Sequence, residues 1–335
     1  MSMPYFFAAF ALSIAVTWLT IKIASRLRIV DQPDAKRKRH LGAVPLLGGV
    51  AIFSSFWILI FYLLGWHQVR GLNLIANSLV AAFVGGIILV AIGIADDIKP
   101  FSAKFRLVLV IGGILMVALW IGGFLEKITN PFGGIIQLVP VIGTALTFVW
   151  LLGTTYTTKI LDGLDGLATG VVAIGALMIY FLTSLTKFYQ PNVALVALIF
   201  AGTCAGFLVF NFHPAKIFLG ESGSLLIGYM LGILAVIGGG KLATALLVMA
   251  VPILDVVRVI YVRLRRRQSV FVGDREHLHF QLRDLGWSDR RVVLCYYAVA
   301  AVFGLTTLVL QSYQKLVALL FLAVVMAAVG WKLSR

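Results

Sequence analysis

Two pairs of acidic residues stand out in a chain that is otherwise strongly apolar. Asp96 and Asp97 are adjacent at the end of an apolar run, and Asp162 and Asp165 lie three residues apart in the segment LDGLDG. On a helix, a spacing of three predicts that both carboxylates of the second pair share one face, one turn apart. A fifth acid, Glu221, lies in the segment GESGS. Because like charges held together need a counter-charge, these residues predict a cation-binding site.

The residue types favour magnesium and phosphate chemistry. Mg²⁺ prefers oxygen ligands and typically binds one or two carboxylates together with waters and substrate phosphates. The two cysteines, Cys204 and Cys295, lie inside apolar runs, and the chain has only five histidines, so zinc is disfavoured. Basic residues near the acids favour an anionic ligand such as a phosphate or diphosphate. We therefore expect a site for Mg²⁺, with Mn²⁺ as the alternative.

Membrane-spanning helices must position these acids. The 335 residues are 61% hydrophobic and 12% charged, with a mean hydropathy of +1.02, whereas soluble domains are about 45–50% apolar. Apolar runs of about 17–25 residues cross a bilayer as helices. We expect an all-α, polytopic integral membrane protein that forms one domain over residues 1–335 and has about eleven transmembrane helices, or ten. The expected spans are 5–25, 45–64, 74–95, 106–123, 140–157, 168–186, 192–211, 223–238, 242–262, 291–311 and 316–333. The first has no small-residue cleavage site after it, which indicates a retained span.

The basic residues indicate which side of the membrane each connection faces. One face is expected to carry the connections at about 26–44, 96–105, 158–167, 212–222 and 263–290, and with the C-terminus it holds 21 of the 28 Lys and Arg. The opposite connections hold five, so the positive-inside rule makes the first face cytosolic. Eleven of the 13 Asp and Glu lie there too. Acids contribute little to topology, so their gathering predicts a cytosol-facing functional site.

Five segments on that face, in order along the chain, resemble the polyprenyl-phosphate N-acetylhexosamine-1-phosphate transferases of the glycosyltransferase 4 type. They are DQPDAKRKRHLGAVPLLGG (31–49), the Asp96–Asp97 pair with Lys104 and Arg106 downstream, LDGLDGLATG (161–170), FNFHPAKIFLGESGS (210–224) and DREHLHFQLRDLG (274–286). A lone Asp pair carries little information, whereas five ordered elements on one face are specific.

The resemblance implies a reaction, a location and partners. The reaction is Mg²⁺-dependent transfer of an N-acetylhexosamine-1-phosphate, GlcNAc-1-phosphate first, from a UDP-sugar to polyprenyl (undecaprenyl) phosphate. Its products are a polyprenyl-diphospho-sugar and UMP, and it is the first membrane step of cell-surface polysaccharide synthesis. The expected location is the bacterial cytoplasmic (inner) membrane, as a homodimer, with the lipid bilayer and not nucleic acid as a partner.

The resemblance also implies residue roles. The metal or its waters are expected at Asp97, Asp162, Asp165 and Glu221. The expected catalytic residues are Asp96, Asp97, Asp162, Asp165 and His279, with Asp96 and Asp97 positioning or deprotonating the lipid phosphate. Substrate contacts are expected from His40, Lys104, Lys159, Asn211, Lys216, Arg275 and His277.

Three residues depart from the family pattern. Glu221 replaces the usual Asp, so we expect its carboxylate to bind the metal after a backbone shift or through a water. Lys159 replaces a common Asn, and a cation there is expected to pair with Asp162 or with a substrate phosphate. Phe280 stands where a further histidine is frequent.

Two other functions remain open at this point. A muramoyl-pentapeptide transferase of peptidoglycan synthesis tends to carry three consecutive histidines and ten spans, whereas this chain has His-x-His and about eleven. A non-enzymatic ion transporter should place ionisable residues near the membrane midplane, often with repeat symmetry. Here nearly all acids lie at one interface and no repeat is visible.

Overall fold

Long apolar helices make up most of the chain in the computed structural model, which describes residues 2–31, 42–65, 72–120, 125–185, 188–237, 241–269 and 276–333. Within these ranges, ten helices are long and apolar enough to cross a membrane. They are α1 (Met3–Arg26), α2 (Gly48–Gly65), α3 (Ala76–Ile98), α4 (Ala103–Trp120), α5 (Pro140–Leu161), α6 (Leu167–Ser184), α7 (Pro191–Asn211), α8 (Gly220–Ile237), α12 (Asp289–Val309) and α13 (Ser312–Leu333). The expected all-α, polytopic class is confirmed.

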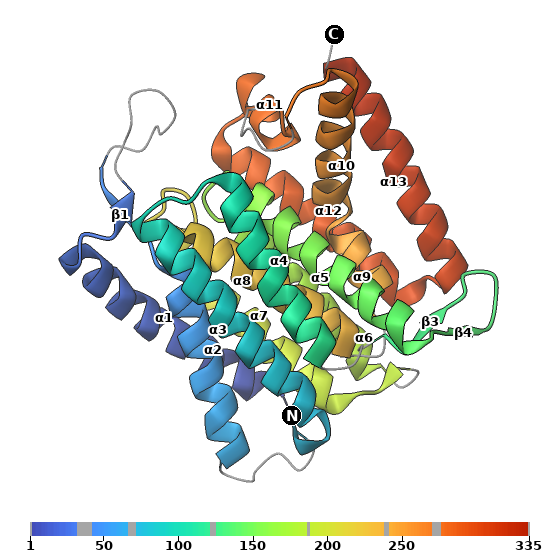
Figure 1. The fold of residues 1–335 in the computed structure, drawn as a ribbon, viewed down its shortest axis with the longest axis horizontal. Coiled ribbons are helices and arrows are strands. Elements are labelled where there is room, and N and C mark those ends of the chain that lie inside the picture. Colours follow the sequence, from blue (N-terminus) through green and yellow to red (C-terminus); the bar gives the residue numbers. More distant parts are fainter. Residues whose placement is uncertain are drawn as a thin grey trace.

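The ninth expected span, 242–262, is broken and not straight. It consists of α9 (Leu242–Val248) and α10 (Ala250–Arg265), which meet at an angle of 74°. Pro252 lies in the first turn of α10, where its missing N–H removes no helical hydrogen bond. Counting the bent pair as one span brings the total among the described helices to eleven. An odd number fits Figure 1, where α1 begins and α13 ends at opposite ends of the bundle.

Helices α6, α7 and α8 form the buried centre. Helix α8 packs against α3 and α5, and α7 packs against α1 and α6. Gly228 and Gly232 let α5 approach α8 closely, because a Cβ on Gly228 would lie 1.9 Å from the Thr158 hydroxyl oxygen. Small residues four apart are a common device for close helix packing in membranes. Thr158 then donates a hydrogen bond to the Ser224 carbonyl at 3.0 Å, which fixes the C-terminal end of α5 beside the start of α8.

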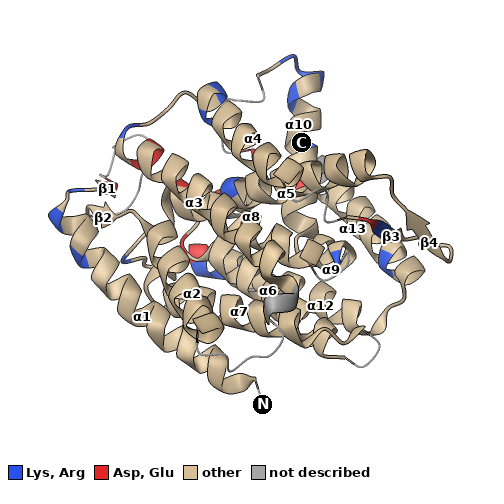
Figure 2. Cartoon of the chain, turned by 60° about the horizontal axis from the view of Figure 1, so that its bottom comes forward, with Lys and Arg blue, Asp and Glu red and all other residues tan. Residues whose placement is uncertain are grey.

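The outer helices expose apolar side chains. Leu119 on α4, Val149 on α5 and Val324 on α13 are each more than half exposed, and in water such surfaces would be an unusually large apolar patch. Figure 2 shows that Lys, Arg, Asp and Glu occupy few positions and that most of the helical ribbon carries none. The exposed surface therefore fits a lipid environment, and the protein is a multi-pass membrane protein.

Short elements fill the connections. The antiparallel pair β1 (Val30–Asp31) and β2 (Val44–Pro45) sets Val30 opposite Pro45, and β3 (Lys127–Thr129) pairs with β4 (Ile135–Gln137) with Ile128 opposite Ile136. A 3₁₀ helix, η1 (Leu72–Ile75), precedes α3, and α11 (Leu278–Asp284) precedes α12. We call the end of the bundle formed by the α3–α4, α5–α6 and α7–α8 connections the carboxylate face.

Candidate active site

The adjacent acids Asp96 and Asp97 contact different parts of the structure. They lie in the last turn of α3 and not in the following connection, so their side chains point about 100° apart around the helix. Asp96 accepts hydrogen bonds from the Phe101 amide (2.6 Å) and from Nη1 of Arg106 (2.7 Å), and only 3% of it is exposed. It therefore ties α3 to α4.

Asp97 fixes the start of α8. Its carboxylate accepts hydrogen bonds from the Glu221 amide at 2.8 Å and from the Ser222 hydroxyl at 3.0 Å, with the Ser222 amide at 3.4 Å. An anion at a helix N-terminus is favourable because the first amides lack helical partners. Gly220 makes this approach possible, since its φ is +68° and a Cβ would lie 2.6 Å from Asp97 Oδ2. The two acids thus lock α3, α4 and α8 together.

The link between α5 and α6 is not helical, so the prediction that Asp162 and Asp165 share one helix face is wrong. Residues 162–166 form turns and a bend, and Gly166 has a left-handed φ of +79° that ends the link. Asp165 Oδ2 accepts a hydrogen bond from the Ala215 amide (3.1 Å) and lies 2.9 Å from His213 Nδ1. Asp165 therefore ties the α5–α6 link to the α7–α8 link.

Asp162 differs from the other four acids. It is half-buried at the C-terminal cap of α5, and its carboxylate makes no hydrogen bond or ion pair with any residue in the described ranges. Burial raises the pKa of Asp162 to about 8, and the nearby Glu221, Asp165 and Asp97 carboxylates add to the rise, while Lys159 opposes it. The acids are thus close enough to interact, and a bound cation would stabilise the ionised form of Asp162.

The two departures Lys159 and Glu221 pair with each other. Lys159 Nζ donates to both carboxylate oxygens of Glu221, and Arg106 Nη1 lies 2.9 Å from Glu221 Oε1 while also binding Asp96. Of the two partners expected for Lys159, Asp162 is wrong, because the ammonium group reaches across to Glu221 in the first turn of α8. A substrate phosphate as its partner stays a prediction. Arg106 joins the cluster, although the sequence pointed to Lys104 as the substrate contact.

Five expected substrate contacts lie apart from this cluster or outside the described residues. Asn211 is buried; its side chain accepts a hydrogen bond from Thr169 (2.9 Å) and donates one to the Ile217 carbonyl (3.0 Å), so it holds the α7–α8 link against α6. Lys104 and Lys216 have exposed side chains. His40 and Arg275 lie outside the described residues.

Asp255, which sequence reasoning did not select, anchors the histidine segment. This residue of α10 lies 2.9 Å from His277 Nδ1, accepts the Leu278 amide at 3.1 Å and pairs with Arg258 at 2.8 Å. An ionisable residue inside an apolar span is a functional candidate by default, and that signal was available from the sequence. The bend between α9 and α10 places this carboxylate under the start of α11.

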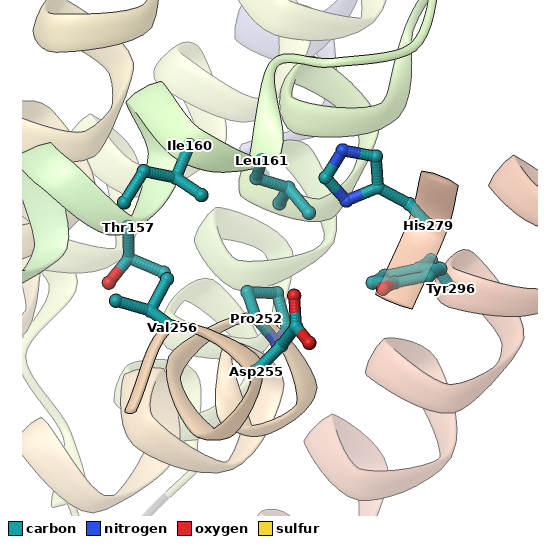
Figure 3. A pocket seen from close by; sticks show the side chains of 8 residues that line it. All are labelled: Thr157, Ile160, Leu161, Pro252, Asp255, Val256, His279 and Tyr296. Atoms are coloured by element: carbon teal, nitrogen blue, oxygen red, sulfur yellow. The ribbon is translucent and has the colours of Figure 1, made fainter. Parts of the chain in front are cut away.

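His279 is buried against the α5–α6 link. Only 1% of it is exposed, and its Nε2, which has no hydrogen-bond partner among the described residues, packs on Gly163, where a Cβ would lie 2.4 Å away. Figure 3 shows its ring above a narrow pocket that it shares with Leu161, Asp255 and Tyr296. Burial lowers the pKa of His279 to about 3, and nearby His277 adds to the effect. The imidazole is therefore neutral at pH 7.

The donor set fits a hard divalent cation. Within the described part of the chain, no three His, Cys, Asp or Glu side chains form a group that would hold a metal alone. Mg²⁺ does not require such a group, because one or two carboxylates suffice when waters and phosphates complete the shell. Among the described residues, the carboxylate of Asp162 has no hydrogen-bond or ion-pair partner, and Oδ1 of Asp165 accepts no hydrogen bond. Both oxygens are free to bind an ion.

Comparison with known proteins places the chain in a family. Residues 79–239 match the model of glycosyl transferase family 4. The chain is 32% identical over 304 residues to a probable undecaprenyl-phosphate N-acetylglucosaminyl 1-phosphate transferase of Bacillus subtilis, covering 89% of this chain and 81% of that protein. It is 32% identical to a decaprenyl-phosphate N-acetylglucosaminephosphotransferase of Mycobacterium tuberculosis (92% and 82% covered). It is 30% identical to an undecaprenyl-phosphate alpha-N-acetylglucosaminyl 1-phosphate transferase of Escherichia coli K12 (84% and 77% covered).

These relatives cover most of the chain, and the family model spans the three connections that supply the carboxylates and their cations. The expected family resemblance is confirmed. This chain belongs to glycosyl transferase family 4 and is a sugar-1-phosphate transferase of that family.

Proposed function

We propose that the protein transfers GlcNAc-1-phosphate from UDP-GlcNAc to polyprenyl phosphate. An oxygen of the lipid phosphate forms a bond to the sugar-linked phosphorus of the donor. The bond from that phosphorus to the oxygen it shares with UMP breaks, and UMP leaves with that oxygen. The products are polyprenyl-diphospho-GlcNAc and UMP. The relatives named above, which act on undecaprenyl or decaprenyl phosphate, support this choice of acceptor and sugar.

One observation carries the proposal: five carboxylates and two cations from α3, α4, α5, the α5–α6 link and α8 lie together on the carboxylate face. Direct contacts join Asp96 to Arg106, Arg106 and Lys159 to Glu221, and Asp97 to the start of α8. A site at the end of a bundle suits this reaction, because the lipid tail stays in the bilayer while the nucleotide arrives from water. The basic connections on this side support a cytosolic orientation in a bacterial inner membrane.

Each residue of the cluster has a separate role in the proposed reaction. Asp162 and Asp165 would hold Mg²⁺, which would act as a Lewis acid and would offset the negative charge that develops on the leaving group. Arg106 and Lys159 supply fixed positive charge beside the reacting phosphates. Asp96 and Asp97 position α4 and α8. A phosphomonoester has a second pKa of about 6, so the lipid phosphate is mostly dianionic near pH 7 and needs no strong base.

Purified protein, undecaprenyl phosphate, Mg²⁺ and a panel of UDP-sugars test the proposal. We expect UMP release and a lipid-soluble diphospho-sugar with UDP-GlcNAc, and neither product when EDTA is added or undecaprenyl phosphate is omitted. The panel includes UDP-MurNAc-pentapeptide, and turnover with that donor alone would show a peptidoglycan enzyme instead. UMP release without any lipid product would contradict transfer. A homodimer remains a prediction that crosslinking in membranes would test.

A further inference from the structure

The contact between Lys159 and Glu221 joins the two positions at which the site departs from its family pattern. One lies in the last turn of α5 and the other in the first turn of α8. The α5–α8 packing at Gly228 and the Thr158–Ser224 hydrogen bond hold these two turns side by side. The pair is therefore set by the packing of the bundle and not by a mobile loop.

The Glu221 carboxylate is already neutralised by protein cations. Lys159 Nζ binds both of its oxygens, and Arg106 Nη1 shares Oε1 at 2.9 Å. Only 15% of the Lys159 side chain and 23% of the Glu221 side chain are exposed, so water screens this pair weakly. A divalent ion on the same oxygens would meet two positive charges at contact distance. A direct metal bond to Glu221 is therefore unfavourable.

The surroundings of Asp162 differ from those of Glu221, because Asp162 has carboxylates nearby and is not paired with a cation among the described residues. Its carboxylate has no bonding partner among the described residues and lies near the other acids of the cluster. Asp165, three residues along the link, has one carboxylate oxygen that accepts no hydrogen bond from a described residue. A cation there would relieve the repulsion among these carboxylates, which Lys159 offsets only in part. The surrounding charges therefore favour a bound metal ion at the α5–α6 link and not at the start of α8.

We propose that Glu221 serves as the counter-ion of Lys159 and Arg106 instead of binding the metal, and that Asp162 and Asp165 alone supply the protein ligands of the divalent ion. This inference rests on the proposed function, because it concerns the metal of that reaction. The Glu side chain is longer than Asp by one methylene and so reaches the ammonium group of Lys159. The two departures then act as one unit: Lys159 brings a fixed cation to the site, and Glu221 keeps that cation in place.

Mn²⁺ binding to the full-length protein in detergent tests this without substrates or turnover. Free Mn²⁺ is measured by electron paramagnetic resonance as the ion is titrated. The informative variant is Lys159→Gln with Glu221→Gln, which removes both partners and leaves the net charge unchanged. We expect its affinity for Mn²⁺ to stay within about threefold of the wild type. Asp162→Asn should weaken binding at least about tenfold, as loss of a metal-site group typically does. The control is Glu126→Gln, because Glu126 is exposed and lies in the α4–α5 connection, at the opposite end of the bundle from the carboxylate face.

The outcomes separate the inference from the function on which it rests. A tenfold loss in the double variant would make Glu221 a ligand and overturn the inference while leaving a metal-dependent enzyme. Failure of the wild type to bind Mn²⁺ would instead remove the metal from the proposed function itself.

A second measurement examines the pair directly. Glu221→Gln leaves the Lys159 ammonium group without its carboxylate, and Lys159→Gln leaves Glu221 with Arg106 alone. Each single variant should therefore unfold at a lower temperature than the double variant. Lys159→Gln alone should also bind Mn²⁺ at least as tightly as the wild type, because it removes a competing cation. Strictly additive shifts in the unfolding midpoint would show that the two side chains are not coupled.

Discussion

Replacing Asp97 by Asn or Ala examines whether this acid fixes the start of α8. Asp97 accepts hydrogen bonds from the Glu221 amide at 2.8 Å and from Ser222 at 3.0 and 3.4 Å. Asp97→Asn keeps the shape and one acceptor but loses the negative charge at the helix N-terminus. Favourable charges at that position contribute about 0.3–1 kcal/mol, and up to about 2 kcal/mol when partly buried. We therefore expect a loss of about 1–2 kcal/mol in the free energy of unfolding.

Asp97→Ala should cost more, because it leaves the two α8 amides without an acceptor. Each unsatisfied buried donor costs about 1–3 kcal/mol, so the expected loss is about 2–6 kcal/mol. Unfolding in detergent, followed by circular dichroism, gives the ranking wild type, then Asn, then Ala. Glu126→Gln should match the wild type, since its side chain is exposed on the other side of the bundle.

The same variants distinguish a structural role of Asp97, in fixing the start of α8, from a direct role in the reaction. If Asp97 acts only through α8, the loss of UMP release in Asp97→Asn should be modest and should parallel the loss of stability. Equal unfolding midpoints for wild type and Asp97→Ala would refute the structural reasoning outright. An Asn variant of near-normal stability with no turnover would assign Asp97 a direct chemical role.

Three further results are expected. Gly220→Ala should lower the free energy of unfolding by about 1–2 kcal/mol, because an L-residue is strained at φ +68° and its Cβ would meet Asp97; unfolding midpoints at or above the wild type would disprove this. Asp255→Asn should speed hydrogen exchange at the Leu278 amide at least about tenfold, since that amide donates to the Asp255 carboxylate, and unchanged exchange measured by mass spectrometry would remove Asp255 as the anchor of the histidine segment. The pKa of His279 is about 3 in the folded protein, below its ordinary value of 6.5, so the unfolded chain binds the proton more tightly. The contribution of His279 to the free energy of unfolding is therefore fully present above pH 6.5. It falls as the pH drops toward 3, by up to about 1.4 kcal/mol per pH unit. His279→Gln should therefore lose less stability than the wild type between pH 6.5 and 5. The variant leaves His277 and Asp255, the titratable groups that act on the His279 ring, unchanged. Identical pH profiles would count against a buried neutral imidazole.

Some features of the site could be inferred from residue order alone. The five acids of the site come at the ends of alternate apolar runs, and alternate runs end on the same side of a membrane. These acids are Asp96, Asp97, Asp162, Asp165 and Glu221. Their gathering at one end therefore followed from helix length and bilayer thickness. The residue types then indicated hard-cation and phosphate chemistry, and the ordered motifs indicated the family that the comparisons show.

Other features depended on packing. Helical spacing suggested one face for Asp162 and Asp165, yet the chain leaves the helix at residue 162 and the two acids face different neighbours. Hydropathy treated 242–262 as one straight span, whereas a 74° bend after α9 brings Asp255 under the histidine segment.

The amino-acid sequence by itself determined the number of apolar spans, the side on which the acids gather and the class of reaction, because these depend on composition and spacing along a single segment. The tertiary structure decided which carboxylate each cation meets. Lys159 and Glu221 are 62 residues apart in the chain, and their contact depends on how α5 and α8 are rotated and how closely their small residues let them approach. No local pattern encodes that rotation, since it results from packing against all neighbouring helices at once.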